Sequence, residues 1–169
     1  EKFDLDDHSK PHIKEIYLRM IDIFLTARKL ADVFNSYEKH FSIDVPKVFL
    51  IKLCDSDNQT AELAIETHTI PMLTREFDNK AIKLYLDSFS HFTFKYTKGQ
   101  LLVTDLRTLF SSSSYKQKLT LFEPVIFSKD KSYGSSDLGL DGISWFMENH
   151  TCSNFCDNWK SKLVCHKFI

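Results

Sequence analysis

A chain of 169 residues is long enough to bury one sizeable core, and its 22 basic and 23 acidic residues leave a net charge of -1. This balance argues against nucleic acid or an anionic membrane as a partner, so we expect neither, and we expect one domain over residues 1–169. Fifteen Phe, six Tyr and two Trp exclude a disordered chain. Apolar runs fall short of the roughly 20 residues of a membrane helix, and the polar start is unlike a secretion signal, so we expect a cytoplasmic protein.

The first predicted element is a long helix from Pro11 to Phe34, with Ser9 placed to cap its N-terminus. Apolar residues recur there at the spacing of one helix face. This face consists of Ile13, Tyr17, Met20, Phe24, Ala27, Ala31 and Phe34. Two strands are predicted next, at 45–53 and 61–70, on either side of the polar turn CDSDNQT.

The middle of the chain predicts a short helix followed by an antiparallel hairpin. The helix covers 77–90 and begins with polar capping residues. The hairpin consists of HFTFKY at 91–96 and LLVTDL at 101–106, both rich in β-forming residues, with Gly99 in the turn between them.

The last third of the chain predicts a loop, a strand and a helical end. The Ser-rich stretch 111–118 is expected to be a flexible loop, and KLTLFEPVIF at 118–127 a further strand. The segment GLDGISWFMENH at 139–150 leads into a C-terminal helical part. Helices and strands in this order indicate the α+β class.

A candidate metal site lies in the stretch ENHTCSNFCDNW, residues 148–159, which contains His150, Cys152 and Cys156. If 150–157 is helical, the two cysteines lie at i and i+4 on one face and offer two thiolates to one ion. Thiolate with imidazole selects zinc, which needs a fourth ligand. The candidates are His68, His91, Cys54 and Cys165. The alternative is that the cysteines are buried apolar residues and His150 is a surface histidine.

Two carboxylates form a second candidate site. Asp105 ends an otherwise apolar strand, and Glu123 precedes Pro124, so the two could meet around a cation. The alternative is that Asp105 caps a turn and Glu123 is solvated.

Several segments together resemble the alpha-kinase family of atypical serine/threonine protein kinases. FSHFTFKYTKGQLLVTDL at 89–106 is similar to the family pattern F-[ST]-H-F-[TS]-Y-E, a turn and L-[LIV]-V-x-D-[LI]-Q-G. DLGLDGISWFMENHTCSNFC at 137–156 is similar to its G-N-L-G-x-x-G-[IM] run and H-x-C-N-x-[IV]-C. YLRMIDIFLTARKLADVFN at 17–35 and IPMLTREFDN at 70–79 follow the family's order upstream.

The resemblance implies the missing metal ligand. In alpha-kinases the histidine of F-[ST]-H-F joins H-x-C-x-x-x-C on one zinc ion, which here means His91 with His150, Cys152 and Cys156. Zinc would then tie the hairpin to the C-terminal helical part and stabilise the fold.

The resemblance also implies catalytic positions, with departures. Asp105 stands at the aspartate of D-[LI]-Q-G, but Arg107 replaces the glutamine. Glu123 replaces the aspartate of T-D-P-Q, and Asp137 and Gly139 fall in the family's nucleotide and substrate loop. Other family positions are occupied by Thr108, Val125 and Phe127. The family's phosphate-binding lysine lies on a strand upstream of the long helix, so we expect most of the N-terminal strand lobe to lie outside this chain.

Three functions remain open on this sequence. In the first, the chain is the larger part of a kinase that uses ATP and Mg²⁺ on a protein substrate, completed by an N-terminal lobe or another segment of the same protein, and Arg107 holds a phosphate. In the second, it is a pseudokinase scaffold that binds a protein partner. The third is a zinc-stabilised interaction domain without kinase ancestry.

Overall fold

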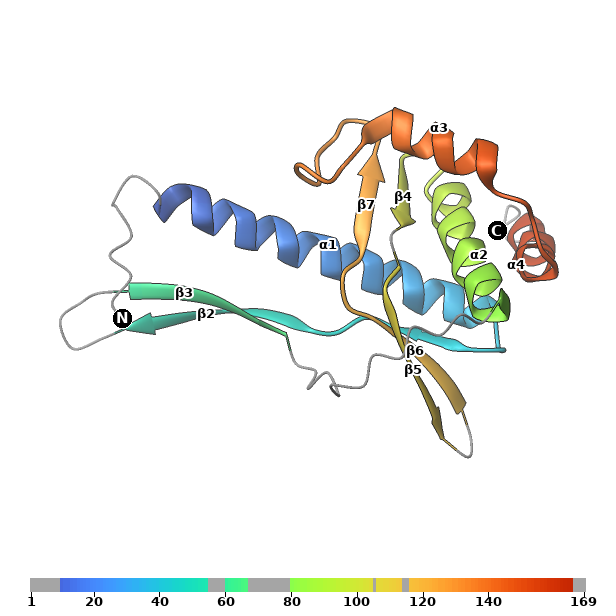
Figure 1. Cartoon of the computed structure of the whole chain (residues 1–169), viewed down its shortest axis with the longest axis horizontal. Helices are drawn as coiled ribbons and strands as arrows, with labels where there is room; N and C mark the ends of the chain where they lie inside the picture. Colours follow the sequence, from blue (N-terminus) through green and yellow to red (C-terminus); the bar gives the residue numbers. More distant parts are fainter. Residues whose placement is uncertain (1–9, 55–59, 67–79, 105, 114–115, 166–169) are drawn as a thin grey trace.

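The computed structural model describes residues 10–54, 60–66, 80–104, 106–113 and 116–165, which form an α+β fold (Figure 1). In chain order the elements are α1 (Lys10–Tyr37), β1 (Ser42–Asp44), β2 (Val48–Cys54), β3 (Thr60–Glu66), α2 (Lys80–Tyr96), β4 (Leu101–Thr104), β5 (Thr108–Ser113), β6 (Lys116–Leu121), β7 (Val125–Ser128), α3 (Gly139–Asn149) and α4 (Asn154–Cys165). Among the described residues, no helix combines the length and apolar character needed to span a membrane.

Helix α1 confirms the predicted long helix and its apolar face. The face is buried over its second half, at Phe24, Ala27, Ala31 and Phe34. The proposed N-cap, Ser9, lies outside the described residues. Because the buried positions recur every three or four residues, a single stripe of α1 supplies one wall of the core.

The C-terminal end of α1 fixes both the core and the first strand. The ring of Phe34 is fully buried and contacts three aromatic rings of α2 at centroid distances of 5.2–5.4 Å. These rings belong to Tyr85, Phe89 and Phe92. The side-chain amide of Asn35 donates to the Ile43 carbonyl at 2.7 Å and accepts from the Ile43 N–H at 2.9 Å. The Phe-Asn pair therefore joins α1 to α2 on one side and to β1 on the other.

The predicted hairpin of 91–96 with 101–106 is wrong. Residues 91–96 are the last turns of α2, which continues the predicted helix beyond residue 90. Helix α2 ends at Tyr96 in a Schellman motif, in which Lys98 has a φ of +55° and donates its N–H to the Lys95 carbonyl at 3.1 Å. Gly99, with a φ of +80°, donates its N–H to the Phe94 carbonyl at 2.8 Å, so the predicted turn glycine belongs to the end of a helix.

The spacing of buried residues explains why this segment is helical. The alternating letters of HFTFKY suggest a strand, but the buried apolar positions continue the period of the preceding helix without a break. These positions are Ile82, Tyr85, Phe89 and Phe92. Helical burial in the aromatic core therefore outweighs the local β preference.

The strands form three small sheets. β4 pairs antiparallel with β7, from Leu101 opposite Ser128 to Thr104 opposite Val125. β5 and β6 are antiparallel and β1 lies parallel to β6. The two strands predicted at 45–53 and 61–70 correspond to β2 and β3, which pair antiparallel. The stretch 111–118, predicted as a flexible loop, is largely strand, because 111–113 belong to β5 and 116–118 to β6. The predicted strand 118–127 is divided between β6 and β7, with Pro124 in the break.

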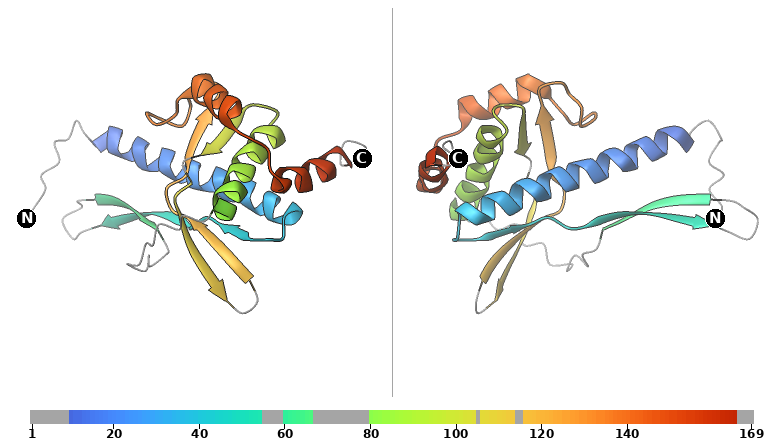
Figure 2. Two further views of the ribbon diagram at one scale, coloured as in Figure 1. Left: turned by 45° about the vertical axis from the view of Figure 1, so that its right-hand side comes forward. Right: turned by 180° about the vertical axis from the view of Figure 1, so that it is seen from behind.

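The elements around α2 gather the chain's functional segments. Helix α2 packs against α4 and against β4, and α3 packs against β7. In the ribbon views, α3 lies across one end of β4 and β7 (Figures 1 and 2). The β2–β3 pair runs along α1, toward the N-terminal end of that helix. The C-terminal end of α3 and the start of α4 consequently lie beside α2.

Candidate metal centre

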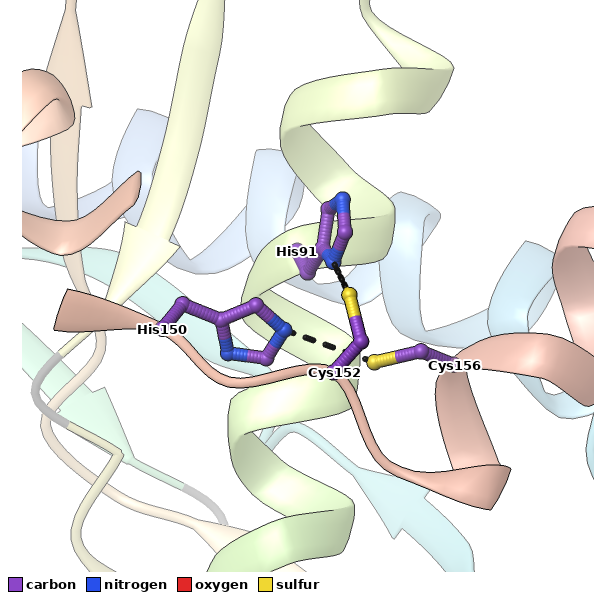
Figure 3. Close-up of side chains that lie close together, drawn as sticks. All are labelled: His91, His150, Cys152 and Cys156. Atoms are coloured by element: carbon purple, nitrogen blue, oxygen red, sulfur yellow. Dashed lines mark hydrogen bonds between the residues drawn. The ribbon is translucent and has the colours of Figure 1, made fainter. Parts of the chain in front are cut away.

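Four side chains with metal-ligand chemistry meet between α2, α3 and α4 (Figure 3). His91 comes from α2, and His150 is the residue that directly follows α3. Cys152 lies in the short segment before α4, and Cys156 lies in the first turn of α4. One ligand atom from each residue lies within 4.8 Å of the other three. The chain thus brings together two imidazoles and two thiols from segments more than 50 positions apart.

The local structure around the two cysteines differs from the prediction. A helix over 150–157 is wrong at its start, because α4 begins at Asn154 and Cys152 lies outside it. The two thiols therefore do not share one helix face. The Ser153 carbonyl instead accepts the N–H groups of Cys156 at 2.8 Å and Asp157 at 3.3 Å, which sets the first turn of α4. Among the other candidate ligands, His68 and the side chains of Cys54 and Cys165 lie outside what the structure describes.

Two distances within the cluster match the spacing of donors around a tetrahedral metal ion. His91 Nδ1 lies 3.6 Å from the sulfur of Cys152, and His150 Nε2 lies 3.4 Å from the sulfur of Cys156. Four donors bound at zinc's usual bond lengths of about 2.0–2.3 Å are separated by roughly 3.3–3.8 Å along the edges of the tetrahedron. Both nitrogen–sulfur distances fall in this range. These two distances suit zinc, and a donor set of two imidazoles and two thiols suits zinc better than calcium or magnesium.

The electrostatic environment keeps the two histidines neutral. Burial, followed by the nearby charges of His150, Lys160 and Lys95, lowers the pKa of His91 to about 4. Burial also lowers the pKa of His150, although the Asp87 carboxylate opposes the shift. Burial raises the pKa of the Cys156 thiol. A neutral imidazole is the form that binds a metal, so both histidines are ready to bind at pH 7, whereas Cys156 must release a proton.

The ring orientation of His91 is consistent with this use of Nδ1. Its side chain is buried, and its Nδ1 points toward Cys152 while its Nε2 points away from the cluster (Figure 3). Within the described part of the chain, Nε2 is buried without a hydrogen-bond partner. The ring of Trp159 contacts the His91 ring edge-to-face at a centroid distance of 5.2 Å. Packing against Trp159 and the contact of Nδ1 with Cys152 therefore orient this ring, without a hydrogen bond at Nε2.

Three residues contact the candidate metal ligands without belonging to the ligand set, and the sequence did not predict them. Lys160 donates from Nζ to the Cys152 sulfur at 3.0 Å. Trp159 donates from Nε1 to the Ser88 hydroxyl at 2.9 Å, and Ser88 in turn hydrogen-bonds Cys156. Sequence spacing provided no signal for Lys160 or Ser88. Lys160 lies one helical turn after Cys156 but hydrogen-bonds Cys152, which is outside α4, and the contact of Ser88 depends on how α2 packs against α4.

Of the three predicted catalytic residues, the structure describes Arg107 and Glu123. Asp105 lies outside the described residues. Arg107 and Glu123 form an ion pair, with Nη1 of Arg107 at 2.7 Å from Oε2 of Glu123, and both side chains are about 60% exposed. The Arg107 carbonyl also accepts the N–H of Phe122 at 3.2 Å. The ion pair and this backbone hydrogen bond hold the two segments side by side. Arg107 and Glu123 therefore contact each other directly, although they belong to separate motifs.

Asp137 and Gly139 shape the loop between β7 and α3. The buried carboxylate of Asp137 accepts the Ser128 N–H at 2.8 Å, the Ser128 hydroxyl at 2.5 Å, the Tyr133 N–H at 3.2 Å and the Gly139 N–H at 2.9 Å. Gly139 has a φ of +67°, and a Cβ there would meet the Lys131 side chain at 2.5 Å. Only glycine fits this position without strain. The two residues hold the loop in one shape through these bonds.

Comparison with known proteins decides the family. The sequence profile described as the alpha-kinase family matches residues 3–156. The chain belongs to the alpha-kinase family. Among curated relatives, transient receptor potential cation channel subfamily M member 6 of Homo sapiens is 28% identical over 159 residues, which is 88% of this chain and 8% of that protein. Eukaryotic elongation factor 2 kinase of Rattus norvegicus is 22% identical over 156 residues, which is 88% of this chain and 20% of that protein.

Solved alpha-kinase domains share the fold of this chain. The alpha-kinase domain of myosin-II heavy chain kinase A in complex with AMP-PNP aligns with a TM-score of 0.65 at 21% identity, covering 92% of this chain and 60% of that one. The inactive D766A domain of myosin heavy chain kinase A in complex with ATP aligns with a TM-score of 0.63 at 23% identity, covering 86% and 58%. This alpha-kinase chain thus spans about 60% of the solved domains it resembles.

Proposed function

We propose that this chain is the larger, C-terminal part of an alpha-type serine/threonine protein kinase domain that transfers phosphate from ATP to a protein substrate with Mg²⁺. The family match over residues 3–156 carries the proposal. The solved neighbours include complexes with ATP and AMP-PNP, which supports a nucleotide site in the complete domain. A lysine-bearing strand and the rest of the N-terminal lobe would come from another segment of the same protein. We also propose a cytoplasmic setting.

A structural zinc ion is part of this proposal. His91, His150, Cys152 and Cys156 would hold it, and the grouping of their four donor atoms within 4.8 Å of one another supports this ligand set. Bound there, zinc would supply no chemistry to the transfer and would join α2 to the start of α4. Four protein ligands fill its coordination, which is typical of structural rather than catalytic zinc.

The transfer itself would depend on a few charged residues. Asp105, at the aspartate of the family's D-[LI]-Q-G motif, would orient the substrate hydroxyl and hold Mg²⁺. Arg107 would leave Glu123 and pair with a phosphate, because a guanidinium donates two parallel hydrogen bonds to such a group. Asp137 and Gly139 would keep the nucleotide and substrate loop in the shape described above.

The ion pair of Arg107 with Glu123 favours a second candidate function. A guanidinium cannot coordinate Mg²⁺, and here it occupies the carboxylate that would otherwise be available for a cation. A domain with this pair closed would be a pseudokinase scaffold for a protein partner. The two candidates make opposite predictions for phosphate transfer.

The test is transfer of phosphate from ATP by the full-length protein that contains this chain, measured with Mg²⁺ and a range of protein substrates. We expect transfer, and we expect Asp105→Ala to lower its rate by about 100-fold or more with the circular dichroism spectrum unchanged. Asp22→Ala, an exposed aspartate of α1, is the matched control and should retain the rate. Absence of transfer from the unaltered protein would overturn the kinase proposal and favour the scaffold.

A further inference from the structure

The two thiols of the metal centre differ in their surroundings. Cys156 is buried and Cys152 is exposed. Cys152 nevertheless has a charged neighbour, because the Lys160 ammonium lies 3.0 Å from its sulfur. The same ammonium lies 5.8 Å from the centre of the Trp159 ring. Lys160 therefore extends back along the surface of α4 toward the exposed sulfur.

The buried thiol has a separate donor. Trp159 is 1% exposed and Ser88 is fully buried, and the indole N–H donates to the Ser88 hydroxyl at 2.9 Å. The hydroxyl then has its own hydrogen free to donate to Cys156, and this bond lowers the pKa of the thiol against the larger, opposite effect of burial. Two consecutive residues of α4 thus act on the two sulfurs. Trp159 acts on Cys156 through Ser88, and Lys160 hydrogen-bonds Cys152 directly.

Hydrogen bonds to a metal-bound thiolate have predictable effects. Each bond withdraws charge from the sulfur, so the sulfur competes less well for protons and reacts less readily with electrophiles. A buried sulfur is protected from solvent by packing, but an exposed sulfur depends on its hydrogen-bond donor. Replacing such outer partners typically weakens metal binding by about 10–100-fold.

We propose that Lys160 is a positioning residue of the metal centre, whose hydrogen bond to Cys152 holds this exposed sulfur on the ion and shields it from reaction. The inference rests on the zinc site of the proposed function. The nearby Asp157 carboxylate adds a smaller favourable interaction with the ammonium, and the hydrogen bond to Cys152 is the larger one. Lys160 acts through Cys152 and does not touch the ion.

The main test compares zinc retention in three forms of the zinc-loaded protein. Lys160→Gln removes the ammonium, Lys160→Arg keeps a cationic donor, and Lys95→Gln removes another positive charge near His91 that does not hydrogen-bond a sulfur. We expect Lys160→Gln to release zinc to a chromogenic chelator with about a tenfold weaker affinity. Lys160→Arg should restore most of the affinity, and Lys95→Gln should leave it near that of the unaltered protein.

Two further measurements separate this role from a general loss of stability. Iodoacetamide should alkylate Cys152 faster in the Lys160→Gln protein, as read by peptide mass spectrometry, with Cys156 unchanged. In the cobalt(II)-substituted protein, the sulfur-to-metal charge-transfer band should move to longer wavelength in Lys160→Gln and not in Lys95→Gln, because the freed thiolate is a stronger electron donor. Equal zinc affinity, alkylation and band position in the two Gln variants would overturn the inference. Failure of the unaltered protein to bind zinc would overturn both the inference and the zinc site.

Discussion

Arg107 and Glu123 are single residues on which the two candidate functions depend. Each departs from the family pattern, and each is the other's partner at 2.7 Å. Both side chains are about 60% exposed, so the pair contributes little to stability, on the order of 0–1 kcal/mol. The ion pair therefore contributes little to the stability of the fold, and we expect its effect in phosphate binding.

Replacing Arg107 tests which function the pair serves. We expect Arg107→Gln to lower the rate of transfer by about 10–100-fold, because it removes a charge-assisted hydrogen bond to phosphate worth roughly 1.5–3 kcal/mol. The melting temperature should change little. The measurement is a steady-state transfer assay alongside a thermal melt. An increase in transfer would mean that Arg107 blocks the site rather than serving it.

Glu123→Gln is the matched control for this prediction. It removes the ion-pair partner of Arg107 while keeping the size of the side chain. If Arg107 acts on phosphate, the freed guanidinium should keep or increase nucleotide affinity.

At the scale of elements, α2 carries residues of both the core and the metal centre. Phe89 and Phe92 face the core, while Ser88 and His91 contact the thiols of α4 and its preceding segment. Small and aromatic residues alternate within this helix, so that both of its faces can be buried. Because His91 lies on the face toward α4, the stability of the α2–α4 contact should depend on the protonation of His91.

Acidification should weaken this contact before the carboxylates titrate. The pKa of His91 is lowered to about 4 by burial, then by the charges of His150, Lys160 and Lys95. Unfolded chains take up a proton on this histidine below about pH 6.5, while the folded protein does so only near pH 4. The stability that neutral His91 provides is complete above pH 6.5 and is lost as the pH falls toward 4.

Thermal melts of the metal-free protein between pH 7 and pH 5 measure this loss. The melting temperature should fall more steeply in the unaltered protein than in His91→Asn, which has no imidazole to protonate. Zinc-loaded protein should release its ion over the same range, because protons compete for the ring nitrogens. Parallel slopes for the two metal-free proteins would contradict the prediction.

The sequence predicted those elements whose own pattern decides their structure. Helix α1 follows from one long apolar stripe, and the pair of β2 with β3 follows from two apolar segments around a polar turn. The segment 91–96 was predicted wrongly because its local alternation favours a strand, whereas its burial depends on Phe34 in another helix. Tertiary packing overrides local preference there.

The residues of the metal centre also divide into those that the sequence predicts and those that only the folded chain brings together. Three of its candidate ligands could be named from their spacing in one short stretch, whereas His91 was chosen among four candidates only through the resemblance to the alpha-kinase family. Lys160 and Ser88 could not be named with them, because their contacts depend on the packing of α4 against α2 and on the loop that brings Cys152 back toward it. The contact of Arg107 with Glu123 likewise depends on β5 and β6, which pair and so bring together the residue before β5 and the segment after β6.

At the scale of the whole molecule, the metal centre closes a long loop of chain. His91 and Cys152 are 61 positions apart, and β4 to β7 and α3 lie between them. Joining these points through an ion removes freedom from the unfolded chain, by an amount that grows slowly with loop length. Zinc would thus hold α3 and α4 onto the core that α1 and α2 build.

The zinc content of the purified protein tests this account most directly. Elemental analysis by plasma mass spectrometry should find one zinc ion per chain, retained on gel filtration, and none in Cys156→Ala. Chelation should lower the melting temperature of the unaltered protein toward that of Cys156→Ala and should not change that of the variant. A protein that purifies without zinc, does not take it up when refolded with zinc, and melts at the same temperature with and without chelator would contradict the account.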